Sequence, residues 1–406
     1  MYKLGDEEDA EDRVFLAGFD RIEARSQERA NTQLRKKRLA YGMAAAAALL
    51  AVVIIVGLSV GLARKSGMPY TCKDERGASY DTTFFVIGDW GRQGSWDQRQ
   101  VARMMADVAQ CMTPSFVIST GDNFYDHGLK SPNDEMFAKS FSNVYDQGSL
   151  QVNWYAVLGN HDYGDKIDPA EDSCAANTLD ACPKGCCYSS VWQFTGRPND
   201  VRWHCQNGTW NVPTGNAGLL DIVMIDTNPF MPHYLNEAWS KNAGGIWQQN
   251  ASQIKQQLRQ RLAASKARWK LVVGHHPIAS YGHHCKFSMD GDCDHMAWLE
   301  ADLQDARVAA YLCGHDHDLQ YITRQSDPAV QDSTPVWPAF VVSGAGSSVR
   351  NNEFGKVNRK EGYNMPFMAD DQGFVAARVN ASHLVMHYYT TSHAAPVYTA
   401  VLAAQR

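Results

Sequence analysis

Short runs of apolar residues, each ending in glycine and polar side chains, recur along the chain from Thr82 onward. The runs are rich in β-branched and aromatic residues and are continuously apolar, which is typical of strands buried on both faces. They are FFVIGDWG, SFVISTGDNFY, NWYAVLGNHDY, LLDIVMIDTN, WKLVVGHHP, VAAYLCGHDHD and AFVVSGAGSS. Helical or loop segments separate these runs, so the pattern predicts an α/β architecture.

Two of the intervening segments have helical periodicity, residues 98–112 and residues 250–267. In the second, Ile254, Leu258 and Leu262 lie along one stripe, which predicts a face packed on the core. Near the C-terminus, apolar and polar residues alternate in FVAARV and LVMHYY. This alternation predicts antiparallel strands that close the domain.

A longer apolar run, AYGMAAAAALLAVVIIVGLSVGLA, lies near the N-terminus. At about 1.5 Å per residue it is long enough to cross a hydrocarbon core of about 30 Å. A cleaved signal peptide is the alternative, but the long tail before the run and the length of the run favour an uncleaved anchor. Residues 35–38 are all basic, whereas only Arg64 and Lys65 follow the run. The positive-inside rule therefore predicts a single-pass type II membrane protein with its large C-terminal part lumenal or extracellular. The expected location is an endolysosomal or cell-surface membrane, and the sequence does not decide between them.

These patterns divide the chain into four expected parts. They are a cytosolic tail at 1–38, a transmembrane signal anchor at 39–63, a stem at 64–80 and a globular domain at 81–406. A net charge of -6 and a pI near 6.1 give no basic surface for nucleic acid.

Acceptor sequons and cysteines support a lumenal or extracellular domain. N-glycosylation is predicted at Asn207, Asn250 and Asn380, all after the apolar run. All ten cysteines also follow the run, and five lie between Cys174 and Cys205, which suits disulfides formed in an oxidising compartment. Their connectivity stays open. Zinc binding is the alternative for Cys182, Cys186, Cys187 and Cys205, but the four contain no C-x-x-C pair.

Five of the predicted strands end in motifs rich in Asp, Asn and His. In chain order these are GDWG at 88–91, GDNFY at 121–125, GNHD at 159–162, VVGH at 272–275 and GHDH at 314–317. One Gly-Asp pair at a strand end is usually a turn, but ligands gather at the carboxyl ends of strands in α/β sheets. Carboxylate, amide, imidazole and phenol groups together suit iron, zinc or manganese. The glycines allow the sharp turns that bring such side chains together.

In these motifs the chain resembles the purple acid phosphatases, whose pattern is D-x-G, G-D-x-x-Y, G-N-H-[DE], V-x-x-H and G-H-x-H. AYLCGHDHDLQY, GDNFY and SGAG look like the versions in the small, mammalian-type, tartrate-resistant members. The resemblance extends from about Thr82 to the C-terminus. It implies a calcineurin-like metallophosphoesterase fold, a β-sandwich flanked by helices in α/β/β/α layers, for residues 81–406.

The resemblance also implies the ligands of a binuclear metal centre. A ferric ion would be bound by Asp89, Tyr125 and His317. A divalent iron, zinc or manganese ion would be bound by Asn160, His275 and His315. Asp122 would bridge the two metals, and the phenolate of Tyr125 would stabilise iron(III) and give the colour of the family.

The expected activity is that of an acid phosphatase acting on phosphate monoesters, phosphoproteins and nucleotides among them. Two cations about 3.5 to 4 Å apart can stabilise both oxygens of an in-line displacement, with metal-bound hydroxide as the nucleophile. His161 and His284 are the candidates to protonate the leaving group, and a one-residue slip would put His283 in place of His284. The histidines expected to be surface or structural residues include His127, His204, His233 and His387.

Two alternatives to this activity remain. A metallophosphoesterase of the same kind could act on nucleotides, diphosphates or phosphodiesters. A cell-surface binding module without turnover is expected to have lost ligands, but all seven positions are filled. Two segments are expected to modify the site: 163–213 as a disulfide-stapled excursion, and 229–245 as a mobile loop over it.

Overall fold

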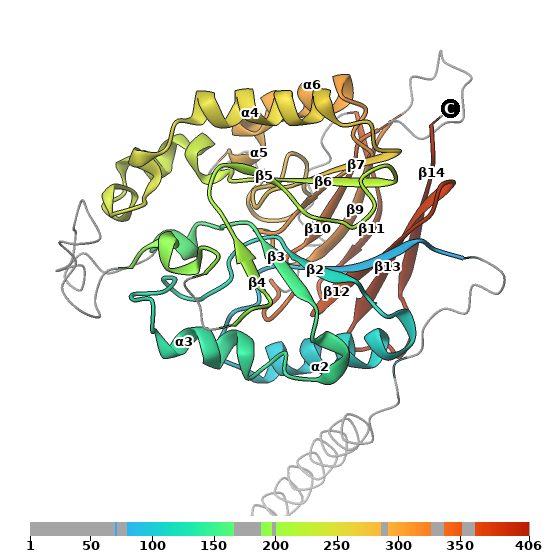
Figure 1. Ribbon diagram of the computed structural model, residues 1–406, viewed down its shortest axis with the longest axis horizontal. Helices are drawn as coiled ribbons and strands as arrows, with labels where there is room; N and C mark the ends of the chain where they lie inside the picture. The colour runs from blue at the N-terminus through green and yellow to red at the C-terminus, as the bar shows by residue number, and fades with distance from the viewer. Residues whose placement is uncertain are drawn as a thin grey trace, which may run out of the picture. The chain divides into compact units, whose positions relative to one another are not determined.

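Two seven-stranded sheets form the centre of the protein in the computed structural model (Figure 1). The structure describes residues 70, 79–165, 188–196, 200–285, 291–325, 337–350 and 362–405. Within these ranges, no helix has the length and apolar character needed to cross a bilayer. The predicted anchor at 39–63 and the cytosolic tail lie outside the described residues.

The first sheet joins four parallel strands to three antiparallel ones. Its strands are β1 (Thr82–Ile87), β2 (Phe116–Ser119), β3 (Asn153–Ala156), β4 (Trp203–Cys205), β12 (Gly373–Val379), β13 (His383–Thr390) and β14 (Tyr398–Ala403). Their order is β14-β13-β12-β1-β2-β3-β4. β1 to β4 pair in parallel, and β12 pairs antiparallel with β1. FVAARV and LVMHYY are the antiparallel strands β12 and β13, as predicted.

The second sheet also has a parallel centre. Its strands are β5 (Thr209–Asn211), β6 (Leu220–Ile225), β7 (Trp269–Val273), β8 (Ala310–Cys313), β9 (Leu319–Arg324), β10 (Ala339–Ser343) and β11 (Tyr363–Ala369). Their order is β11-β9-β10-β8-β7-β6-β5, with β6, β7, β8 and β10 parallel. All seven apolar runs of the sequence are therefore strands, four in this sheet and three in the first.

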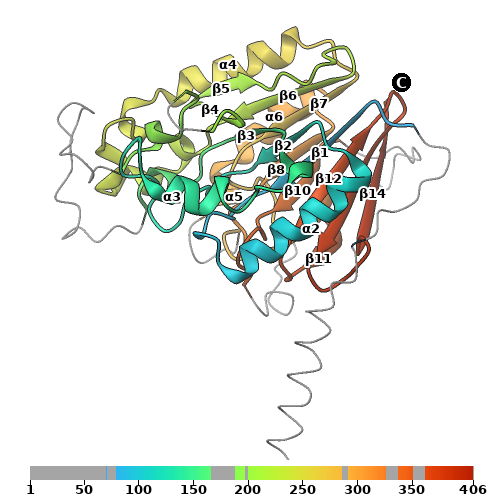
Figure 2. The same ribbon diagram turned by 60° about the horizontal axis from the view of Figure 1, so that its bottom comes forward.

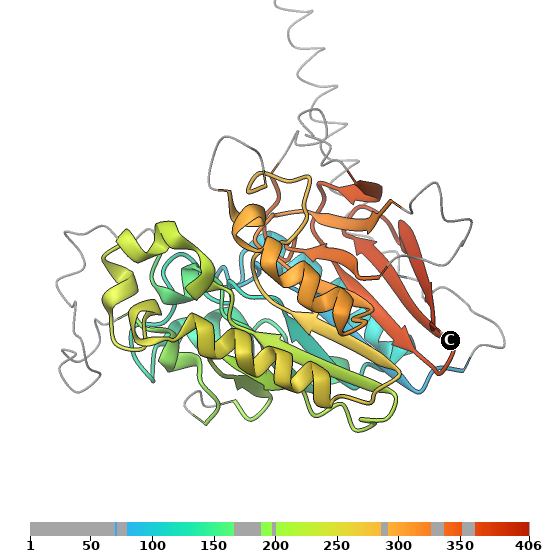
Figure 3. The same cartoon turned by 90° about the horizontal axis from the view of Figure 1, so that it is seen from above.

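Helices cover the outer faces of both sheets, which completes an α/β/β/α arrangement. The helices are α2 (Trp96–Met112), α3 (Glu135–Phe137), α4 (Ala251–Ala264), α5 (Asp292–His295) and α6 (Ala297–Asp305). α2 and α3 lie on the side of the first sheet, and α4 and α6 on the side of the second (Figure 1). α2 runs beside β1 and β12 (Figure 2), and α4 lies across the opposite face (Figure 3).

Alternate residues of one strand belong to different cores, which explains why the runs are continuously apolar. In β1, Phe84 and Val86 face the core between the sheets, whereas Phe85 and Ile87 pack with the residues of α2. The predicted stripe of α4 is buried, with Leu258 fully inaccessible. Because each Å² of buried apolar surface contributes about 25 cal/mol, burial on both faces makes these strands a large contributor to stability.

Two sequence expectations about loops need correction. Residues 163–213 are not wholly an excursion, because β4 and β5 extend the two sheets, and Cys205 of β4 is a buried free thiol rather than a disulfide partner. The other four cysteines of that cluster lie outside the described residues. Residues 229–245 are not a loop without regular structure, because they form short helical turns in which Tyr234 and Trp239 are buried; their mobility stays a prediction.

Candidate metal centre

The seven predicted metal ligands all follow strands whose carboxyl ends meet at one edge of the two sheets. From the first sheet, Asp89 follows β1, Asp122 and Tyr125 follow β2, and Asn160 follows β3. From the second sheet, His275 follows β7, and His315 and His317 follow β8. Parallel pairing aligns the ends of these strands within each sheet, so the side chains of loops distant in sequence converge.

Asp89, Tyr125 and His317 form one group of ligand atoms. Tyr125 Oη lies 3.1 Å from Asp89 Oδ1 and 3.1 Å from His317 Nε2. His317 Nε2 lies 3.4 Å from Asp89 Oδ1. A phenol, a carboxylate and an imidazole thus direct three potential donor atoms to one point.

Asn160, His275 and His315 form a second group. His275 Nε2 lies 3.2 Å from Asn160 Oδ1 and 3.1 Å from His315 Nδ1. Asp122 stands between the groups, with Oδ2 2.8 Å from Tyr125 Oη and Oδ1 3.5 Å from His275 Nε2. The structure therefore brings all seven predicted residues together as two triads that share one carboxylate, and this donor set fits two metal ions.

The glycines of the motifs are required by close approach. A Cβ at Gly121 would lie 2.6 Å from His275 Nδ1, and one at Gly314 would lie 2.3 Å from Asp89 Oδ2. A Cβ at Gly159 would lie 2.1 Å from Asp122 Oδ1. Any side chain at these positions would therefore displace a ligand.

Asp162, the last residue of the GNHD motif, ties two of the ligand loops together. Its carboxylate accepts hydrogen bonds from the backbone N–H groups of Asn123, Phe124 and Gly159 at 2.8 to 3.2 Å. The Gln193 amide donates to it at 2.7 Å. Because Asp162 is fully buried, this acceptor fixes the loop that carries Asp122 and Tyr125 against the loop that carries Asn160.

Burial and neighbouring charges set the protonation of the ligands. Burial alone would raise the pKa of Asp122, but His275 and His161 lower it to about 2. Burial lowers the pKa of His315 well below its usual value, and lowers that of His317 to about 3 with help from Arg350. Both imidazoles therefore keep a lone pair at acidic pH. Burial, and then the carboxylates of Asp122 and Asp89, raise the pKa of Tyr125 well above 10.

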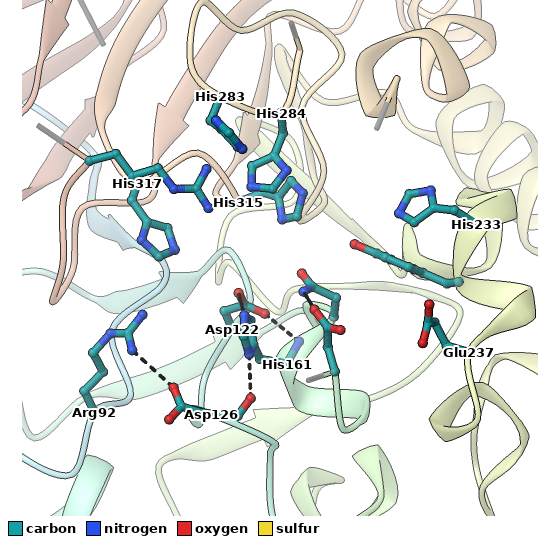
Figure 4. A pocket seen from close by; sticks show the side chains of 14 residues that line it. Arg92, Asp122, Asp126, His161, His233, Glu237, His283, His284, His315 and His317 are labelled. Atoms are coloured by element: carbon teal, nitrogen blue, oxygen red, sulfur yellow. Dashed lines mark hydrogen bonds and ion pairs between the residues drawn. The ribbon is translucent and has the colours of Figure 1, made fainter. Parts of the chain in front are cut away.

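A cavity of about 420 Å³ opens beside the two triads. Its lining includes both predicted proton donors, His161 and His284, and also His283, the alternative to His284 (Figure 4). His161 Nδ1 lies 2.5 Å from the backbone oxygen of Asp126, which orients the ring. The ring of His284 lies against that of His315, with the centroids 3.8 Å apart and the planes tilted by 36°.

Several residues of the cavity were not predicted from the sequence. His233 was expected to be a surface or structural residue, yet it lines the cavity, opposite Arg92 in Figure 4. Arg92 lies with its guanidinium carbon 3.7 Å from the centroid of the Tyr125 ring, and Arg350 also lines the cavity. The only available signal was the position of Arg92 directly after the GDWG motif.

The other three histidines that the sequence predicts to be surface or structural residues make contacts away from the triads. His127 Nδ1 lies 2.8 Å from the backbone oxygen of Asp165, and His387 Nδ1 lies 3.1 Å from Thr399 Oγ1. His204 stacks on Tyr155.

Comparison with known sequences identifies relatives of one kind. The family described as calcineurin-like phosphoesterase matches residues 82–319. Purple acid phosphatase 17 of Arabidopsis thaliana is 36% identical over 313 residues, which cover 76% of this chain and 80% of the relative. Tartrate-resistant acid phosphatase type 5 of Oryctolagus cuniculus is 29% identical over 297 residues, 67% of this chain and 74% of the relative.

Solved structures share the fold at lower identity. A purple acid phosphatase of yellow lupin, PPD1, superposes with a TM-score of 0.52 and 14% identity, covering 79% of this chain and 53% of that one. GAP50 of Plasmodium, titled the anchor in the inner membrane complex, superposes with a TM-score of 0.57 and 21% identity, covering 81% of this chain and 90% of that one.

Proposed function

Because the chain belongs to the calcineurin-like phosphoesterase family and, within it, to the purple acid phosphatases, we propose that this acid phosphatase works through a binuclear iron(III)–divalent metal centre. The observation that carries the proposal is the pair of ligand triads joined by Asp122. The fold alone does not support a phosphatase, since GAP50 of Plasmodium shares the fold and is described as an anchor in the inner membrane complex.

The residues divide between two sites. Asp89, Tyr125 and His317 would hold the ferric ion, and Asn160, His275 and His315 the divalent iron, zinc or manganese ion. Asp122 would bridge them. When bound, the two cations would neutralise the phosphate charge and supply the nucleophilic hydroxide. A phenol is the donor in this set that favours iron(III), and Tyr125 is 3% exposed, so water is kept from its oxygen.

His161 and His284 would act on the leaving group of a phosphate monoester. Both rings line the cavity beside the triads, so a proton on either can reach an ester oxygen placed there. The Nδ1 of His161 faces the backbone oxygen of Asp126 at 2.5 Å, and its Nε2 lies 3.9 Å from Asp122 Oδ2, the carboxylate that joins the triads. His283 lines the same cavity and stays the alternative to His284.

The test is hydrolysis and metal content measured on the same purified chain. We expect two metals per chain, one of them iron, and release of phosphate from p-nitrophenyl phosphate with an acidic optimum. Phosphoserine peptide, nucleoside monophosphate, diphosphate and phosphodiester substrates at equal concentration then separate monoester hydrolysis from the alternative activities. A colourless protein with one metal would contradict the binuclear centre.

We also propose that residues 39–63 anchor the enzyme in a membrane, with residues 81–406 on the lumenal or extracellular side. Asn207 and Asn250 are exposed, as glycan acceptors must be, whereas Asn380 is half-buried and its amide donates to Ser79 O at 3.0 Å. Alkaline extraction of membranes should leave the full chain in the pellet, and a chain lacking residues 1–65 should be soluble. Release of the full chain by alkali would overturn the anchor. Peptide mapping should find glycans at Asn207 and Asn250 ahead of Asn380.

A further inference from the structure

Asp292 is a buried carboxylate outside the seven proposed ligands, and three imidazoles surround it. Its side chain is 1% exposed. Its Oδ2 lies 2.9 Å from His315 Nε2 and 3.5 Å from His284 Nδ1, and its Oδ1 lies 3.8 Å from His233 Nε2. In the part of the chain that the structure describes, only histidines pair with this carboxylate, and its Oδ1 accepts no hydrogen bond. Such a group is costly to bury, so its retention calls for a specific role.

The two ring nitrogens of His315 face different partners. Nδ1 lies 3.1 Å from His275 Nε2, inside the second triad, and Nε2 lies 2.9 Å from Asp292. A proton on Nε2 that is donated to Asp292 leaves the lone pair of His315 on Nδ1. This is the arrangement in which a carboxylate fixes the tautomer of a metal-binding histidine and raises its basicity.

A disulfide holds this carboxylate next to the site. Cys285 directly follows His284, Cys293 directly follows Asp292, and the two cysteines are bonded to each other. The bond therefore joins the chain segment that carries His284 to the segment that carries Asp292. The ring of His284 in turn lies against that of His315, with the centroids 3.8 Å apart, so the three side chains form one packed unit.

We propose that Asp292, held by the Cys285–Cys293 disulfide, is a positioning residue that orients His315 and His284 and so secures the divalent metal of the centre. The inference rests on the proposed binuclear centre. It makes one half of the centre depend on the disulfide: the iron triad has no contact with Asp292, whereas the divalent triad loses the partner of His315 when the bond is reduced.

The experiment compares metal retention in the full chain and in matched variants. Each protein is loaded with iron and zinc and dialysed against buffers of graded free Zn²⁺, and zinc, iron and the visible band are measured together. Asp292→Ala should bind zinc about 10- to 100-fold more weakly, the usual effect of removing such a partner, with iron and the band retained. Asp294→Ala is the control, because Asp294 is exposed on the same short helix α5.

The Cys285→Ala/Cys293→Ala variant should weaken zinc binding in the same selective way, and so should mild reduction of the wild type. Asp292→Ala that holds zinc as tightly as wild type overturns the inference. So does parallel loss of zinc, iron and the band, which would mean a general structural role. A second zinc that binds the wild type but not Asp292→Ala also overturns the inference, because it would make Asp292 itself a ligand. If the wild-type protein binds fewer than two metals and shows no visible band, the proposed binuclear centre itself is overturned.

Discussion

Asp89, Asp122 and His315 have φ angles of 58°, 51° and 69°, in the left-handed region. For residues other than glycine this backbone costs roughly 1 to 2 kcal/mol each. Asp and His are among the residue types that tolerate it best. The fold therefore places three of the seven proposed ligands in strained positions by its own packing, and we infer that metal binding offsets part of this cost.

Tyr125 is the residue that distinguishes an iron(III) centre from a colourless one. Tyr125→Phe should abolish the visible band, because phenylalanine has no oxygen to bind iron. The measurement is an absorption spectrum of metal-loaded protein with iron quantified in the same sample. Tyr234→Phe is the control: Tyr234 lines the same cavity, but its hydroxyl lies 2.9 Å from His276 Nε2. A band that survives in Tyr125→Phe would argue against the ferric assignment.

Asp162 should matter for stability more than its absence from the ligand set suggests. Asp162→Ala removes the acceptor of at least three buried backbone N–H groups, and each unmet donor costs about 1 to 3 kcal/mol. We expect the free energy of unfolding to fall by about 3 kcal/mol or more in urea denaturation. Asp126→Ala should cost less than about 1 kcal/mol, because the Asp126 side chain is 66% exposed and its ion pair with Arg92, at 3.4 Å, is a surface one. Equal effects of the two substitutions would contradict this role.

The sequence predicts that the seven proposed ligands converge because each lies within a few residues after an apolar strand. Asp292 and His233 have no such marker. The Cys285–Cys293 disulfide joins the segment of Asp292 to that of His284, and the ring of His233 lies against the buried Tyr234 with the centroids 4.2 Å apart. These contacts depend on tertiary packing, which local patterns do not encode.

Strands, like site residues, divide into those that a local sequence pattern predicts and those that tertiary packing places. Strands β1 and β6 to β8 are predictable because both faces are buried, whereas β4 and β5 have three residues each and carry no periodicity of their own. Their pairing with β3 and β6 places them. Short edge strands are thus a consequence of the sheet rather than of their own sequence.

Asn250 is both a predicted glycosylation site and the N-cap residue of helix α4. Its Oδ1 accepts from the Gln253 N–H at 3.0 Å, which satisfies a free donor of the first turn. Without a glycan, Asn250→Ala should cost about 1 kcal/mol in the free energy of unfolding, and Asn250→Asp should cost little. Ser252→Ala removes the sequon but leaves the cap, so it separates the loss of the glycan from the loss of the hydrogen bond. If Asn250→Asp is as destabilising as Asn250→Ala, the cap is not the cause.

For the whole molecule, the centre joins the two sheets, since each triad draws ligands from both. His317 of the second sheet meets Asp89 and Tyr125 of the first, and Asn160 of the first meets His275 of the second. Metals bound there would hold the sheets together at the edge where their strands end. We therefore expect the metals to contribute to the stability of the entire domain.

Removal of both metals should lower the free energy of unfolding by several kcal/mol. A single site at 1,000 times its dissociation constant contributes about 4 kcal/mol by mass action. In the metal-free protein, burial and the Asp122 carboxylate raise the pKa of Asp89, and that of Tyr125 is raised as well, so both groups take up protons as the metals leave. Metal binding then releases protons, and the affinity falls as the pH falls.

Thermal denaturation of chelated and reloaded protein at fixed pH measures the contribution of the metals to stability. Calorimetric titration of metal in two buffers of different ionisation enthalpy measures the number of protons released on metal binding. Identical melting with and without metal would mean that the triads are rigid for reasons of packing alone. Binding without proton release would mean that Asp89 and Tyr125 are already ionised in the empty site, against the direction in which burial shifts them.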